Sequence, residues 1–167
     1  TLHLFNRGLS IKEISGQRGI KESTVWGHLA KLIEYNQLPV WKVLSKEKPE
    51  LHLVFVGSND FLYRKLKQHV KKNIGEGKIH FLENINDERL SELYRGAIAL
   101  VRPSLMEGFS LPPLEAMENR CLVLASDIPV QREIFEDSII YFDQFKTHDI
   151  LTKMNHVLNL SQSEKEK

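Results

Sequence analysis

The sequence predicts an α/β fold in which helices flank a parallel sheet, preceded by a small all-α unit. Three observations support this. Apolar residues make up 41% of the 167 residues, which is enough for a packed core. Up to about Leu44 the apolar pattern is helical and contains no strand-like runs. From Leu51 onward, short apolar runs alternate with amphipathic stretches, as in β-α units around a parallel sheet.

This change of pattern divides the chain into three parts. We expect a helical unit over residues 1–44, an α/β unit over residues 45–160 and a tail over residues 161–167. The tail contains no apolar residue and is expected to be disordered. The stretch from Lys46 to Glu50 is charged and contains a proline, which is typical of a boundary between units.

The first unit has the pattern of a helix, a tight turn and a second helix. Ser10 and Glu13 have the spacing of a capping box for the first helix, and Gly19 allows the turn that follows it. The second helix is expected to begin at Ser23 and Thr24. The residues expected to form the small core between the helices are Ile14, Ile20, Val25 and Leu29.

Each element of the α/β unit is predicted from its apolar pattern. In the first helix of this unit, Leu62, Leu66 and Val70 lie on one stripe, which we expect to be buried. Asn86 is expected to cap the second helix. The expected strands cover residues 51–57, 78–82, 98–101, 122–125 and 139–142, and the expected helices cover residues 61–74, 87–96, 149–160 and a stretch that begins near Pro113.

The segment after the third strand carries the chemistry. It reads Arg102-Pro-Ser-Leu-Met-Glu-Gly-Phe-Ser-Leu-Pro-Pro-Leu-Glu-Ala-Met117 and places a glycine-containing loop before a helix that proline favours at its start. Free N–H groups and the positive end of the helix dipole at this point suit a diphosphate. Glu107 and Glu115 frame the loop. Two glutamates at this spacing also occur by chance in charged chains, so the spacing alone does not identify a site.

The whole segment resembles the E-x7-E signature of retaining GT-B glycosyltransferases, in particular those of family 4, or group 1. The likeness runs from about residue 48 to residue 160 and includes Leu53-Val-Phe-Val-Gly57 and Tyr141-Phe-Asp143. It implies a partial GT-B C-terminal domain with a Rossmann-like sheet. Family members usually carry a small residue and a glycine where this chain has Asn119 and Arg120.

The resemblance implies a role for each residue of the signature. Glu107 would be the catalytic residue, placed beside the transferred sugar. Glu115 would accept hydrogen bonds from the ribose hydroxyls of a nucleotide-sugar donor, which suits an acceptor-only carboxylate. No metal and no other cofactor is expected. The backbone N–H groups expected to bind the donor diphosphate belong to Gly108, Phe109, Ser110 and Leu111.

The resemblance also implies a second domain that holds a glycan or lipid-linked acceptor. We find only the donor-binding half, without its opening repeat, and therefore expect a fragment that is inactive alone. The missing repeat would leave a sheet edge open to the N-terminal unit or to self-association. A single cysteine and the lack of a long apolar run indicate a cytoplasmic location. The resemblance also allows a peripheral position on the inner membrane face.

The N-terminal unit gives a second hypothesis. The stretch from Gly8 to Leu29 resembles the helix-turn-helix of RecQ-type helicases, whose second helix would enter the major groove of duplex DNA. A DNA-binding module on an inactive α/β scaffold is therefore the alternative function, and a purely structural fragment is the third. Trp26 is equally suited to burial against the α/β unit. The candidate DNA contacts are Lys21, Ser23, Thr24, Trp26, His28 and Lys31.

Overall fold

A computed structural model describes residues 1–25, 28–29, 50–73 and 78–160. The chain divides into two compact units, residues 1–85 and residues 86–167. The expected tail over residues 161–167 lies outside the described residues. No helix in the described part of the chain combines the length and apolar character that crossing a bilayer requires.

Two short helices open the first unit, α1 (Leu2–Asn6) and α2 (Ile11–Arg18). The predicted capping box is confirmed, because the Ser10 hydroxyl accepts from the Glu13 N–H at 3.3 Å and the Glu13 carboxylate accepts from the Ser10 N–H at 2.8 Å. Gly19 ends α2 with a φ of 60°, and helical residues resume at Glu22. Ile20 is half-buried, and the buried apolar residues in the described part of residues 1–29 are Phe5, Ile11, Ile14, Val25 and Leu29.

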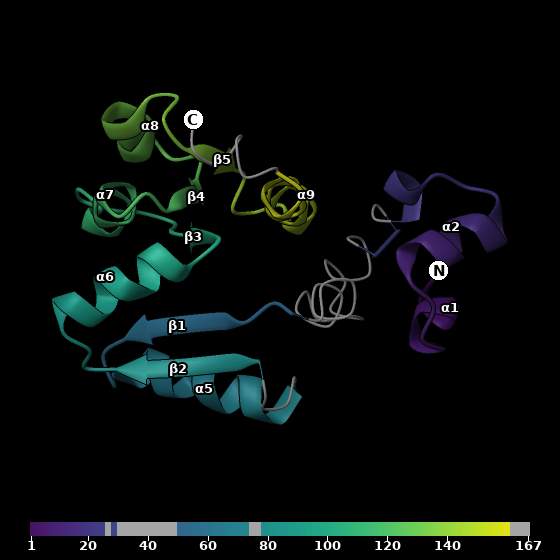
Figure 1. Cartoon of the computed structure of the whole chain (residues 1–167), viewed down its shortest axis with the longest axis horizontal. Coiled ribbons are helices and arrows are strands. Elements are labelled where there is room, and N and C mark those ends of the chain that lie inside the picture. The colour runs from purple at the N-terminus through teal and green to yellow at the C-terminus, as the bar shows by residue number, and fades with distance from the viewer. Residues whose placement is uncertain (26–27, 30–49, 74–77, 161–167) are drawn as a thin grey trace. The chain divides into compact units, whose positions relative to one another are not determined.

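The first unit also contains two parallel strands, β1 (Leu53–Gly57) and β2 (Ile79–Glu83), with Leu53 opposite Ile79. Helix α5 (Phe61–Asn73) lies against this pair (Figure 1). The Tyr63 ring meets the Phe81 ring edge-on, and its hydroxyl donates to the Leu82 carbonyl at 2.9 Å. A Cβ at Gly57 would lie 2.8 Å from the Tyr63 ring, so this approach requires glycine.

The expected burial of the α5 stripe was wrong for two of its three residues. Val70 is buried, but Leu66 is exposed and 73% of Leu62 is exposed. Tyr63 takes the place over the sheet instead, because its ring packs on Phe81 while its hydroxyl reaches backbone carbonyls. The apolar pattern cannot tell which of Leu62 and Tyr63 is buried, because the tyrosine ring is as well suited to burial as the leucine side chain.

The second unit is built on three parallel strands in the order β3-β4-β5. Every described ladder is parallel, as predicted, but the strands form two sheets, β1-β2 and β3-β4-β5. Helix α8 was not predicted, because its seven residues are too few to show a clear helical period. The strands are β3 (Ala99–Arg102), β4 (Leu122–Ser126) and β5 (Ile140–Phe142), and the helices are α6 (Asp87–Gly96), α7 (Leu111–Glu118), α8 (Pro129–Phe135) and α9 (Thr147–Leu158).

Strand β4 is central and is buried on both faces. Val123 and Ala125 join a core to which α6, α7 and α8 contribute Tyr94, Ala116 and Phe135. Leu124 lies in a second core with Phe142 of β5 and Val157 of α9. Since neighbouring residues of a strand point to opposite faces, the two cores confirm the prediction of helices on both sides of this sheet.

We expect Arg120→Gly to stabilise the protein by about 0.5–1 kcal/mol. Arg120 is exposed and has a φ of 58°, a left-handed conformation that disfavours residues with a Cβ. Denaturant unfolding would measure the change. Glu118→Gly, in α7 itself, is the control and should destabilise by about 1 kcal/mol. A loss of stability in Arg120→Gly would contradict this account of the turn.

We expect Gln131→Met to stabilise the protein by about 1–2 kcal/mol. The Gln131 side chain is fully buried, and neither its Nε2 nor its Oε1 has a hydrogen-bond partner among the described residues. Methionine keeps the shape and removes two polar atoms that burial penalises. Thermal unfolding would measure the difference. Gln17→Met, at an exposed position, should change stability by less than about 0.5 kcal/mol. Equal effects at both positions would contradict the prediction.

Candidate functional site

The loop between β3 and α7 ends in a constrained backbone. Ser110 precedes α7 with a φ of 65°, and the helix has proline in its first turn. Pro112 and Pro113 carry no N–H, so proline itself removes donors from the start of the helix. In the described structure, the backbone N–H groups of residues 108–111 donate no hydrogen bond. Four consecutive free donors therefore precede the two prolines, as an anion site requires.

Glu107 lies in this loop and is held through one oxygen. Its Oε1 accepts from the Arg102 Nε at 2.9 Å and lies 2.6 Å from the Arg102 Nη2. The Ser104 hydroxyl donates to the same oxygen. Only 16% of the Glu107 side chain is exposed. The guanidinium therefore neutralises a largely buried carboxylate and fixes its orientation.

Glu115 lies one turn into α7 and is also held through one oxygen. Its Oε2 accepts from the Tyr94 hydroxyl of α6 at 3.3 Å. Tyr94 is buried, and this burial, together with the nearby Glu115 carboxylate, raises the pKa of Tyr94 to about 12. The phenol therefore keeps its proton throughout the neutral pH range and acts as a hydrogen-bond donor to Glu115.

The two glutamates thus share one arrangement. Each uses one carboxylate oxygen for contacts with the protein, and its other oxygen has no partner in the part of the chain that the structure describes. Ser110 contributes a third unused group, since its Oγ is buried without a hydrogen-bond partner among the described residues. The loop and helix start therefore combine free donors in the backbone with free acceptors on the two carboxylates.

Sequence reasoning identified the glutamates but missed the residues that hold them. Arg102 and Ser104 lie close to Glu107 along the chain, and a carboxylate near an arginine was a signal that could have found them. Tyr94 is 21 residues from Glu115 and belongs to another helix. No local pattern places its hydroxyl, which reaches Glu115 because α6 packs against α7.

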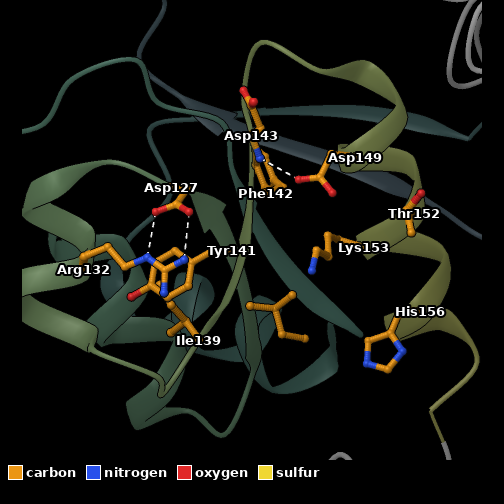
Figure 2. A pocket seen from close by; sticks show the side chains of 11 residues that line it. Asp127, Arg132, Ile139, Tyr141, Phe142, Asp143, Asp149, Thr152, Lys153 and His156 are labelled. Atoms are coloured by element: carbon orange, nitrogen blue, oxygen red, sulfur yellow. Dashed lines mark hydrogen bonds and ion pairs between the residues drawn. The ribbon is translucent and has the colours of Figure 1, made fainter.

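A pocket of about 700 Å³ lies elsewhere in the second unit, and none of the predicted site residues lines it. It follows β5 between α8 and α9 (Figure 2). Arg132 lines the pocket, with its Nε 2.7 Å from the Asp127 Oδ1 and its Cζ 3.8 Å from the centre of the Tyr141 ring. In the described residues, no group of three or more His, Cys, Asp or Glu could hold a metal ion.

The structure places part of the candidate DNA surface. Lys21, Ser23 and Thr24 are exposed. His28 is half-buried, and its Nδ1 lies 3.0 Å from the Thr1 hydroxyl and 3.1 Å from the Arg18 Nη1. The remaining two candidates, Trp26 and Lys31, lie outside the described residues. DNA binding by this surface stays a prediction.

Comparison with known families and proteins gives consistent matches. The family described as glycosyl transferases group 1 matches residues 32–167, which begins upstream of the boundary expected at residue 45. The serotype-specific mannosyltransferase WbdA of Escherichia coli is 35% identical over 138 residues, covering 80% of this chain and 16% of the relative. The O-antigen chain mannosyltransferase RfbU of Salmonella typhimurium is 37% identical over 89 residues, covering 53% of this chain and 25% of the relative.

A solved structure supports the fold. The N-terminal domain of Candida albicans trehalose-6-phosphate phosphatase matches with a TM-score of 0.59 at 16% identity, covering 85% of this chain and 32% of that chain. At this identity the match supports the fold alone. The chain spans between about a sixth and a quarter of the length of the mannosyltransferase relatives it matches.

We expect Tyr94 to make stability depend on pH between about 10 and 12. The folded protein holds the phenolic proton more tightly than the unfolded chain, so this contribution is complete below pH 10 and is lost as the pH rises to about 12. The loss should be on the order of 2 kcal/mol. Urea unfolding across this range should show a smaller decline for Tyr94→Phe than for the wild type. Identical declines would contradict the raised pKa.

Proposed function

Because the chain belongs to the group 1 glycosyl transferases, we propose that its Glu107–Glu115 segment binds the nucleotide-sugar donor of a retaining mannosyl transfer. The observation that carries this proposal is the pair of carboxylates, each with one oxygen held by the protein and one left for a ligand. Glu107 precedes the run of free backbone donors, and Glu115 follows it one turn into α7. A sugar nucleotide presents hydroxyl donors on both sugars and acceptor oxygens on the diphosphate between them, which matches this order of groups.

We assign the two glutamates to the two sugars of the donor. Glu107 accepts from hydroxyls of the transferred sugar and orients it. The Arg102 ion pair supports this role, because a fixed carboxylate positions a reacting sugar without first having to order itself. Glu115 accepts from the ribose hydroxyls through its unoccupied Oε1.

The diphosphate is assigned to the backbone of residues 108–111. Their N–H groups have no acceptor within the described structure. The positive end of the α7 dipole lies at the same point of the chain, where the helix begins. As the sugar leaves, negative charge grows on the diphosphate, and fixed N–H donors stabilise that charge. The buried Ser110 hydroxyl offers one more donor. We propose that no metal is required, since these groups supply the stabilising positive charge.

We propose mannose as the transferred sugar, since the WbdA and RfbU relatives are named as mannosyltransferases. For the whole protein we propose transfer to a glycan or lipid-linked acceptor, as one step in building an O-antigen-like polysaccharide. Donor binding is the part of that activity assigned to these residues.

Titration of the 15N-labelled chain with GDP, GDP-mannose and UDP, followed by NMR, tests donor binding. We expect amide shifts concentrated in residues 107–116, because these residues surround the proposed diphosphate and ribose. Glu115→Ala should weaken binding about ten-fold or more, as expected for loss of a hydrogen bond to a charged group. Glu118→Ala, an exposed residue in the same helix, should bind as the wild type does. No shift at millimolar nucleotide would overturn the proposal.

A further inference from the structure

We propose that Tyr94 is a positioning residue that fixes the Glu115 carboxylate for the ribose of the donor. This inference rests on the proposed function and adds a residue that the E-x7-E signature does not contain. It concerns an interaction between two helices, α6 and α7, both within the second unit.

The Tyr94 ring is fixed by the core. Only 8% of the residue is exposed, and it belongs to the cluster that contains Ala116, Cys121 and Val123. Ala116 is the neighbour of Glu115 in α7, so the helix that carries the glutamate packs on the cluster that holds the tyrosine. A ring held in this way places its hydroxyl at one fixed point beside Glu115.

The direction of the hydrogen bond fits a positioning role. The neutral phenol donates to the Oε2 of Glu115 at 3.3 Å, and this uses one of the two carboxylate oxygens. The Oε1 then remains for a ligand hydroxyl. Glutamate has three rotatable bonds, and holding one oxygen removes much of the entropy that a ligand would otherwise have to overcome.

The other described tyrosines show that burial alone does not explain this contact. Tyr63 donates to the carbonyls of Phe55 and Leu82, and Tyr141 donates to the carbonyl of Gln131. Both satisfy a buried hydroxyl with backbone. Of the three tyrosines in the described ranges, Tyr94 alone donates to a side chain, and that side chain is a signature carboxylate. Tyr141→Phe is therefore a matched control, since it removes a buried hydroxyl of the same core cluster whose bond goes to the Gln131 carbonyl and not to a signature residue.

The experiment measures calorimetric affinities of Tyr94→Phe, Tyr141→Phe and the wild-type chain for GDP, 2′,3′-dideoxy-GDP and pyrophosphate. We expect Tyr94→Phe to weaken GDP binding about five-fold to ten-fold and to leave dideoxy-GDP and pyrophosphate affinities unchanged. Only the effect on GDP depends on ribose hydroxyls. In a Glu115→Ala background, Tyr94→Phe should have no further effect, because the carboxylate it positions is gone. Tyr141→Phe should bind all three ligands as the wild type does.

Two results would overturn the inference and are distinct. If the wild type binds GDP and Tyr94→Phe binds it equally well, or loses the same factor for dideoxy-GDP, then Tyr94 has a structural role only and the proposed function stands. If the wild type binds none of the three ligands, the proposed function fails and the inference fails with it. Denaturant unfolding of each variant shows whether it is folded. Glu115→Gln keeps the shape of the side chain and tests the same contact by changing its acceptor instead of its donor.

Discussion

Burial of β4 on both faces is the constraint on which the second unit depends. Its alternating side chains enter two separate cores, one beneath α6, α7 and α8 and one beneath α9. A strand buried in this way fixes the helices on each side, because close-packed interiors do not allow them to slide independently. The placement of α7 follows from this packing, and with it the position of Glu115 relative to Tyr94. The candidate site is therefore a product of the core and not of its loop alone.

The site combines charges that are held with groups that are free. Arg102 neutralises Glu107, and the Tyr94 hydroxyl satisfies one oxygen of Glu115, so neither carboxylate is buried without a partner. Between them, the left-handed Ser110 turns the chain so that four N–H groups remain without an acceptor in the described structure. Residues 108, 109 and 111 are exposed, so their N–H groups can bind water or a ligand. This combination is what a preorganised anion and sugar site requires.

Left-handed backbone bears on one difference between this chain and the family pattern. Arg120, where the resemblance leads us to expect glycine, has a positive φ angle, as Ser110 also has. The turn still forms at Arg120, where the Cys121 N–H donates to the Ala116 carbonyl at 2.9 Å. The chain therefore makes this turn at a conformational cost. The buried Gln131 side chain also lowers stability locally, because neither of its polar atoms has a hydrogen-bond partner among the described residues.

The sequence by itself determined the parallel α/β class, most element positions, the two caps at Ser10 and Asn86, and the loop with its two glutamates. These features depend on local periodicity and on residues a few positions apart, which a sequence displays directly. Tertiary structure alone decided that Tyr63 and not Leu62 is buried, that α8 forms, and that Tyr94 meets Glu115 across 21 residues. Each of these outcomes depends on contacts between residues that packing brings together. The spacing of residues along the chain does not show such contacts.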